Sequence, residues 1–135
     1  MKPDHQIITD IIHEGAHVLD LGCGNGELLS LLRRHKKALV QGIELDEEQM
    51  HTCVENGLTV LQGDIESGLA DYPDQSFDYV ILNQIMQEIK KADYVIQESL
   101  RLGHKVIVGF PNFAHLSARW TLFFSGKTPI NEALP

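Results

Sequence analysis

The chain has 135 residues, 43% of them hydrophobic and 22% charged, which predicts one globular domain over residues 1–135 and excludes a wholly disordered chain. Its 19 acidic and 11 basic side chains give a net charge of −8, which argues against nucleic acid and anionic membranes as partners, because both bind clustered lysine and arginine. No apolar run approaches the ~20 residues of a membrane span, and Asp4 and Asp10 interrupt any export signal, so the expected location is cytoplasmic.

The first half of the chain alternates apolar runs with amphipathic stretches. Asp4 is the expected N-cap of a lead-in helix within residues 1–15. A strand over 17–21 then meets three glycines and a leucine-rich helix that ends in basic residues. A second strand over 38–45, a helix over 46–55 capped by Asp46 and a short third strand over 58–62 follow.

The second half continues this alternation after a loop around residues 68–75. The run 77–82 is predicted to be the most buried strand, and it precedes a helix over 94–102 and a fifth strand over 105–110. Residues 115–124 have helical spacing of their large apolar side chains, so 111–135 is expected to form a C-terminal helix and tail. Strands that alternate with helices predict an α/β fold with a doubly wound, mostly parallel sheet.

The strongest functional signal is the segment 18–27, where Asp20 is followed by Gly22, Gly24 and Gly26 between a strand and a helix. Glycines let the backbone turn tightly and approach a ligand closely, which predicts a nucleotide-like ligand over this turn. In the dinucleotide pattern G-x-G-x-x-G the helix N-terminus holds a pyrophosphate. Here the third glycine comes one residue early and a carboxylate precedes the first. That carboxylate favours a cation, and S-adenosylmethionine (SAM) carries a sulfonium and an ammonium.

Two further acids follow the next strands. Glu44 lies 18 residues after Gly26, near the ~20-residue offset of a carboxylate that binds ribose hydroxyls. Asp64 can accept a hydrogen bond from an adenine amino group, and Leu45 and Ile65 are predicted to sandwich the adenine ring. Alone, Glu44 would be a strand-end acid and Asp64 a helix N-cap, so the SAM site is inferred from the combination.

Cysteine and histidine usage predicts no further chemistry. Cys23 and Cys53 are expected to be free thiols, with Cys23 contributing its backbone to the cofactor site. His13 and His17 have no nearby cysteine to complete a zinc set, so no metal site is expected. Asn83, after the buried strand, either lines the methionine end of SAM or caps the next helix.

These residues resemble the class I SAM-dependent methyltransferases over about residues 5–110. A narrower resemblance to the methionine biosynthesis protein MetW family is carried by the runs VLDLGCGNGELL, FDYVILNQIMQ and FPNFAH. The resemblance implies a Rossmann-like class I fold with strand order 3-2-1-4-5, in which residues 16–110 are the nucleotide-binding core. It also implies a role in methionine biosynthesis.

Two functions are compatible with this resemblance. The first is a SAM-dependent methyltransferase that acts on a small molecule and releases S-adenosylhomocysteine. The alternative is a non-catalytic SAM sensor that activates homoserine O-acyltransferase, a partner to which the MetW family is linked. The segment after Leu82 lacks the Asn-Pro-Pro-aromatic motif of amino-directed nucleic-acid and protein methyltransferases, which disfavours that class. No catalytic residue is assigned; His115 is a candidate base or a surface histidine.

The resemblance also exposes an expected absence. A full class I domain adds an antiparallel pair of strands after the fifth, whereas only 25 residues follow Phe110 and they show no further β-rich run. Strands 6 and 7 are therefore expected to be missing, either because the domain is shortened or because the chain is a fragment of a longer protein.

Overall fold

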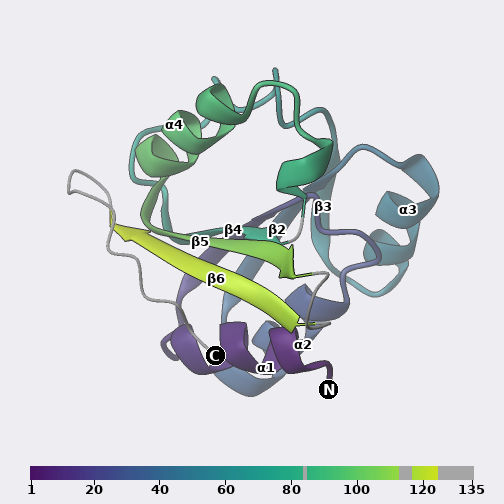
Figure 1. Cartoon of the computed structure of the whole chain (residues 1–135). Helices are drawn as coiled ribbons and strands as arrows, with labels where there is room; N and C mark the ends of the chain where they lie inside the picture. Colours follow the sequence, from purple (N-terminus) through teal and green to yellow (C-terminus); the bar gives the residue numbers. More distant parts are fainter. Residues whose placement is uncertain (84, 113–116, 125–135) are drawn as a thin grey trace.

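The structure, a computed structural model, describes residues 1–83, 85–112 and 117–124. Within these residues a six-stranded sheet carries helices on both faces (Figure 1). The strands are β1 (His17–Leu21), β2 (Leu39–Glu44), β3 (Thr59–Gln62), β4 (Phe77–Asn83), β5 (Gly103–Asn112) and β6 (Ser117–Phe124). The helices are α1 (Pro3–Ile11), α2 (Glu27–Lys36), α3 (Glu47–Glu55), the 3-10 turn η1 (Met86–Glu88) and α4 (Ala92–Leu102). None of the described helices is long and apolar enough to cross a membrane.

The sheet has the order β3-β2-β1-β4-β5-β6, and its first five strands are parallel. This confirms the α/β fold and the predicted order 3-2-1-4-5. The chain reverses its direction of winding between β1 and β4, so loops that leave the carboxyl ends of these two strands diverge to opposite faces. Such a switch point is where doubly wound folds bind ligands.

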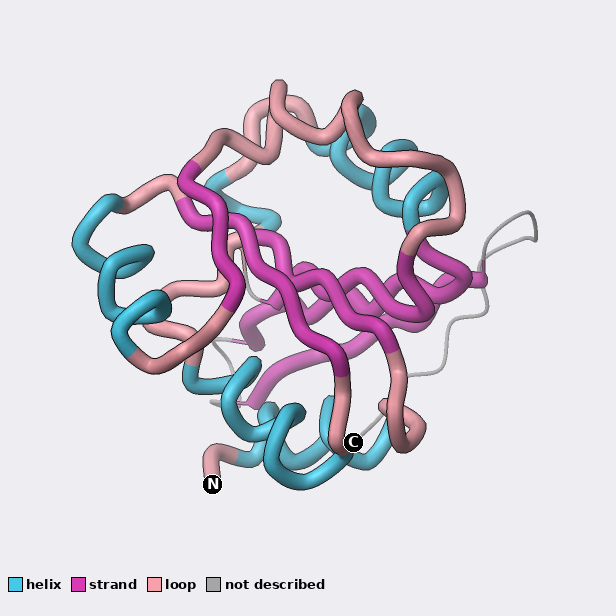
Figure 2. Tube along the Cα trace, turned by 180° about the vertical axis from the view of Figure 1, so that it is seen from behind, coloured by secondary structure: helices cyan, strands magenta, loops and turns pink. Residues whose placement is uncertain are grey.

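Alternating side chains of the strands supply a separate core for each face of the sheet. Ile8 of α1 and Leu32 of α2 pack with Val18 and Ile81 on one face, and all four are buried. On the other face Val95 of α4 packs with Leu19, beside the buried Val80 and Leu82. Figure 2 shows the same two layers from behind, with α1 and α2 on one side of the sheet and α4 on the other. Because β4 is buried on both faces, the prediction that 77–82 is the most buried strand agrees with its burial pattern.

The C-terminal prediction is wrong in one respect. Residues 117–124 form a strand rather than part of a helix, and this strand, β6, pairs antiparallel with β5 from Lys105↔Phe124 to Asn112↔Ser117. One antiparallel strand therefore follows the fifth strand, where strands 6 and 7 were both expected to be missing. Trp, Thr and Phe are β-forming residues, and pairing removes the exposed edge of β5, which outweighs the helical spacing. His115 lies outside the described residues.

The first helix also begins differently from the prediction. Lys2 is the N-cap of α1 and Pro3 is its first residue, so Asp4 lies inside the first turn. Proline suits this position because its missing N–H would have no helical partner. The Asp4 carboxylate remains favourable there through the helix dipole. By contrast, Asp46 caps α3 as predicted and accepts a hydrogen bond from the Glu48 amide at 3.0 Å.

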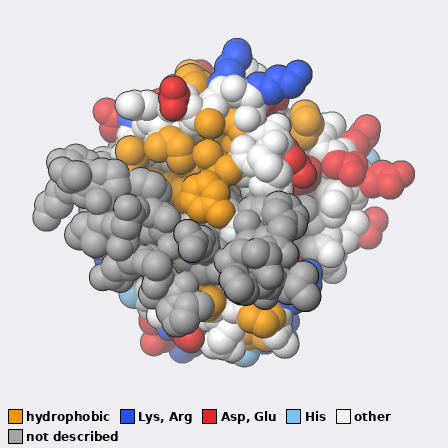
Figure 3. Space-filling model, in the orientation of Figure 1, with side chains coloured by type: hydrophobic (Ala, Val, Ile, Leu, Met, Phe, Trp, Pro, Cys, Tyr) orange, Lys and Arg blue, Asp and Glu red, His pale blue; other side chains and the backbone are white. Residues whose placement is uncertain are grey.

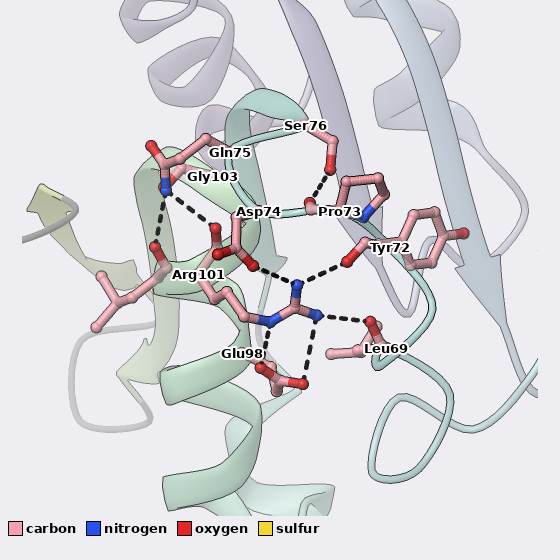
Figure 4. A network of polar contacts seen from close by, with 10 residues as sticks. Leu69, Tyr72, Pro73, Asp74, Gln75, Ser76, Glu98, Arg101 and Gly103 are labelled. Atoms are coloured by element: carbon pink, nitrogen blue, oxygen red, sulfur yellow. Dashed lines mark hydrogen bonds and ion pairs between the residues drawn. The ribbon is translucent and has the colours of Figure 1, made fainter.

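The long connection between β3 and β4, residues 63–76, contains no helix or strand, and α4 holds it in place. Figure 4 shows Arg101 of α4 between Asp74 and Glu98, with its guanidinium turned to the backbone of this connection. The guanidinium donates to the carbonyl oxygens of Tyr72 at 2.6 Å and Leu69 at 2.9 Å. These bonds anchor a segment whose beginning carries the predicted adenine residue.

The last glycine of the turn, Gly26, lies where neighbouring side chains leave no space for a Cβ. Gly26 is the N-cap of α2 with φ +81°, and a Cβ there would lie 2.4 Å from Leu58 Cδ1 and 2.9 Å from Cys53 Sγ. Gly26→Ala is expected to lower the free energy of unfolding by about 1–2 kcal/mol through φ strain and by about 1–3 kcal/mol more through overpacking. Urea denaturation measures this loss.

Gly15→Ala is the matched control, since Gly15 has φ +77° and a Cβ added there would meet no neighbouring atom of the described residues within 4 Å. It carries the φ strain alone, about 1–2 kcal/mol. Equal losses in the two variants would show that Leu58 and Cys53 yield without cost and would contradict the packing argument.

Candidate cofactor site

The glycine turn lies at the carboxyl end of β1 and contacts the end of β2. The amides of Gly22 and Cys23 both donate to the Ile43 carbonyl, at 2.8 and 3.2 Å. Gly22, Gly24 and Gly26 all have positive φ, between 57° and 81°, as the predicted tight turn requires. A Cβ on Gly22 would lie 3.3 Å from the Ile85 side chain, so this glycine permits the close approach of the turn to the segment after β4.

Glu44 fixes the turn from the neighbouring strand. One carboxylate oxygen accepts from the Gly24 amide at 2.7 Å, and the other accepts from the Asp46 amide at 2.9 Å. The two bonds orient the carboxylate at the end of β2 and connect the glycine turn to the start of α3. A carboxylate has about four acceptor positions, so this arrangement leaves capacity for hydroxyl donors from a ligand.

Asp20 is the most unusual ionisable group at these strand ends. Its residue is only 3% exposed, and its Oδ1 has no hydrogen-bond partner. Burial, with a smaller contribution from the Glu44 charge, raises the pKa of Asp20 from 3.8 to about 8. An unpaired buried carboxyl costs stability, and such perturbed groups gather at functional sites. A cation placed beside Asp20 would favour its ionised form.

Two cavities open around these residues. The larger, about 370 Å³, combines carboxylates with aliphatic side chains and is lined by Gly22, Ile43, Glu44, Leu45, Asp46, Gln49, Gly63, Asp64, Ile65, Glu66, Ile85, Glu88 and Ile89. The smaller, about 250 Å³, is more polar and is lined by Lys2, His5, Asp20, Gly22, Cys23, Gly24, Asn25, Glu27, Leu28, Gln49 and Asn83. Gly22 and Gln49 line both cavities, so the two adjoin at the glycine turn.

The structure brings the sequence-predicted site residues to these cavities in two groups. Glu44, Leu45, Asp64 and Ile65 line the larger cavity. The smaller one is lined by Asp20, Cys23, Gly24 and Asn83, with Gly22 shared between the two. Gly26 is instead buried between α2 and α3, where it permits close packing.

Two predicted residues have further bonds that bear on their alternative roles. Asp64 Oδ1 accepts from the Glu66 amide at 2.8 Å and so caps a turn, not a helix. The 3-10 turn η1 has Ile85 at its N-cap, whereas the side-chain nitrogen of Asn83 lies 3.5 Å from an Asp4 carboxylate oxygen. Asn83 therefore belongs to the cavity wall rather than to a helix cap.

Sequence patterns missed several residues of the cavity walls. His5 reaches the smaller cavity from α1, and Gln49 reaches both from α3. Glu66 accepts from the amides of Lys90 and Lys91, at 2.7 and 2.6 Å, and so joins the loop after β3 to the start of α4. Of these residues, only Gln49 could have been expected from the sequence, because it lies one helical turn after Asp46, which follows the end of a predicted strand.

The surroundings of the site are acidic. Figure 3 shows Asp and Glu side chains gathered at the right, on the side of the molecule where Figure 1 places α3. Glu47 and Glu48 begin this helix, next to the larger cavity. A negative rim at the carboxyl ends of the strands favours a ligand with net positive charge.

A Rossmann-like sheet with a glycine turn and carboxylates at successive strand ends defines the class I methyltransferase fold. The family model described as "Methionine biosynthesis protein MetW" matches residues 2–135. The chain therefore belongs to the MetW family of methionine biosynthesis. It is 37% identical over 137 residues to the "Bifunctional methionine biosynthesis protein MetXA/MetW" of Rhodopirellula baltica, with 96% of the chain aligned. The chain spans only 22% of that relative's length.

Solved structures agree on the fold. A TehB-like SAM-dependent methyltransferase from Corynebacterium glutamicum superposes with a TM-score of 0.69 at 20% identity, over 84% of this chain and 67% of that one. The [4+2]-cyclase SpnF superposes with the same TM-score at 24% identity, over 78% of this chain and 43% of that one. The same fold thus occurs in a protein named for a different reaction, so the fold does not define the chemistry.

The buried carboxyl of Asp20 predicts a pH-dependent stability. Because its folded pKa of about 8 lies above the unfolded value of 3.8, the unfolded chain loses this proton first as pH rises. This group therefore lowers the free energy of unfolding between pH 4 and 8, by at most ~1.4 kcal/mol per pH unit. Asp20→Asn removes the effect, so the variant should gain stability relative to wild type from pH 5 to pH 8.

Chemical denaturation at the two pH values measures this gain. Asp71→Asn, a change at an exposed carboxyl, is the control and should shift stability equally at both pH values. A pH-independent difference between wild type and Asp20→Asn would refute the proposed ionisation.

Proposed function

We propose that this protein binds SAM across the two cavities. The adenosine occupies the larger cavity, where Glu44 accepts from the ribose hydroxyls, Asp64 accepts from the adenine amino group, and Leu45 and Ile65 pack on the ring. The methionine end occupies the smaller cavity. The observation that supports this best is that Asp20, which lines the smaller cavity, has an unpartnered buried carboxyl oxygen that favours a cation.

We further propose that the bound SAM is used for methyl transfer to a small molecule of methionine biosynthesis. SAM supplies an electrophilic methyl group, so the chain's own residues need mainly to orient the cofactor and exclude water. The acceptor would enter beside Asn83 and Phe110, since Asn83 pairs with Gly109 on the adjacent strand and Phe110 is 36% exposed there. S-adenosylhomocysteine is the expected product.

A second candidate function uses the same pocket without catalysis. The Rhodopirellula baltica relative carries MetXA and MetW in one name and is much longer than this chain. Together with the link between the MetW family and homoserine O-acyltransferase, this supports a SAM sensor that docks on that enzyme. In this case SAM binding would change the acyltransferase rate, and no methylated product would form.

Calorimetric titration with SAM tests the premise that both functions share. Glu44→Ala removes the proposed ribose acceptor and the bond to the Gly24 amide, so the Kd for SAM is expected to rise about 10- to 100-fold. Glu55→Gln, at the exposed end of α3, is the matched control and should bind like wild type. The site assignment fails if wild type does not bind SAM or if Glu44→Ala binds equally well.

Product formation then separates the two functions. Incubation with methyl-labelled SAM and a mixture of methionine-pathway intermediates should yield a labelled small molecule if the protein is a methyltransferase. The regulatory function instead requires that this protein change the rate of a homoserine O-acyltransferase, and that adding SAM alter that change. A rate unaffected by both additions would exclude the sensor.

A further inference from the structure

The smaller cavity is lined by three residues that each carry a buried polar atom without a hydrogen-bond partner. Among the described residues, the buried side-chain nitrogen and oxygen atoms without a hydrogen-bond partner are His5 Nδ1, Asp20 Oδ1 and Asn83 Oδ1. All three residues line this one cavity, although they come from α1, β1 and β4. Because a buried unpaired polar atom costs free energy, three such residues around one cavity point to a ligand that supplies the missing partners.

Packing of α1 accounts for the position of His5. His5, Ile8, Thr9 and Ile12 share one face of the helix, by their three- and four-residue spacing, and all are at most 6% exposed. Ile8 and Ile12 pack in the core with Val18, which docks the helix against the sheet. His5 lies one turn nearer the N-terminus on this face, where it lines the smaller cavity.

The cavity offers partners for both charges of an amino acid. Asp20 Oδ1 and Asn83 Oδ1 are acceptors, suited to an ammonium group. The Asn83 amide nitrogen lies 3.5 Å from Asp4 Oδ2, which turns its oxygen away from that carboxylate. His5 can donate through a ring nitrogen, and the Lys2 ammonium, paired with Glu27 at 3.4 Å, is a second donor that lines this cavity. A carboxylate would find its donors on this side.

We infer that His5 is a specificity-determining residue that contacts the carboxylate of the ligand's amino-acid end and so distinguishes SAM from nucleosides without that end. This inference rests on the proposed SAM site. Asp20 and Asn83 receive the ammonium group, while α1 forms part of the cavity wall through His5. The contribution of His5 is therefore to the amino-acid end alone and leaves adenosine recognition to the larger cavity.

Paired titrations with SAM and 5′-methylthioadenosine, which lacks the amino-acid end, test this role. His5→Leu fills a similar volume without a polar atom and should weaken SAM binding about tenfold, leaving 5′-methylthioadenosine within twofold of wild type. His5→Asn places a polar atom near the Nδ1 position and should restore most of the SAM affinity. Thr9→Val, on the same buried face, is the control and should change neither affinity.

The outcomes distinguish a failure of the role of His5 from a failure of the proposed SAM site. If wild type binds neither probe, the proposed SAM site itself is wrong. If wild type binds both and His5→Leu weakens both equally, His5 only supports the fold. An unchanged SAM affinity in a folded His5→Leu variant also overturns the role, and thermal denaturation of each variant confirms that it is folded.

Discussion

The bond from the Gly24 amide to the Glu44 carboxylate is the contact on which the site depends. A glycine turn with positive φ at three positions has little conformational preference of its own. Glycine populates many backbone conformations, so fixing it in one of them costs conformational entropy. Glu44 supplies the missing constraint, since the same carboxylate also holds the Asp46 amide at the start of α3. The ends of β1 and β2 are thereby fixed relative to each other, and both cavities take their shape from this pair of strand ends.

The smaller cavity is lined by polar residues of α1, β1 and β4 that stability alone would not retain. Asp20, His5 and Asn83 line this cavity, and each has a buried side-chain atom without a hydrogen-bond partner. An apolar residue at any of these positions would avoid the desolvation cost. The buried apolar clusters on the two faces of the sheet supply the stability that offsets this cost. A packed apolar scaffold with unpartnered polar groups at one edge is common in functional sites.

Neither membership in the MetW family nor the methyltransferase fold decides which of the two candidate functions this protein has. Both candidate functions need the same SAM pocket, and they differ in what the bound cofactor does next. The fold itself does not choose between them, as its occurrence in a cyclase illustrates. The bifunctional relative is much longer than the region that matches this chain. The docking function requires a surface that contacts the partner enzyme, whereas the methyltransferase function requires space for an acceptor beside Asn83.

The sequence by itself determined the parallel sheet, its strand order through the family resemblance, and the positions of Asp20, Glu44 and Asp64 at strand ends. Apart from the strand order, these features follow from local signals: apolar periodicity, glycine spacing and an acid at or just after the end of each run. Only the tertiary structure decided that residues 117–124 are a strand, because the helical spacing of their apolar residues is a local pattern that does not show the antiparallel pairing with β5. It alone also brought His5 to the cavity, since that position depends on how Ile8 and Ile12 dock α1 against the sheet. Local patterns specify elements, whereas long-range packing decides which side chains meet.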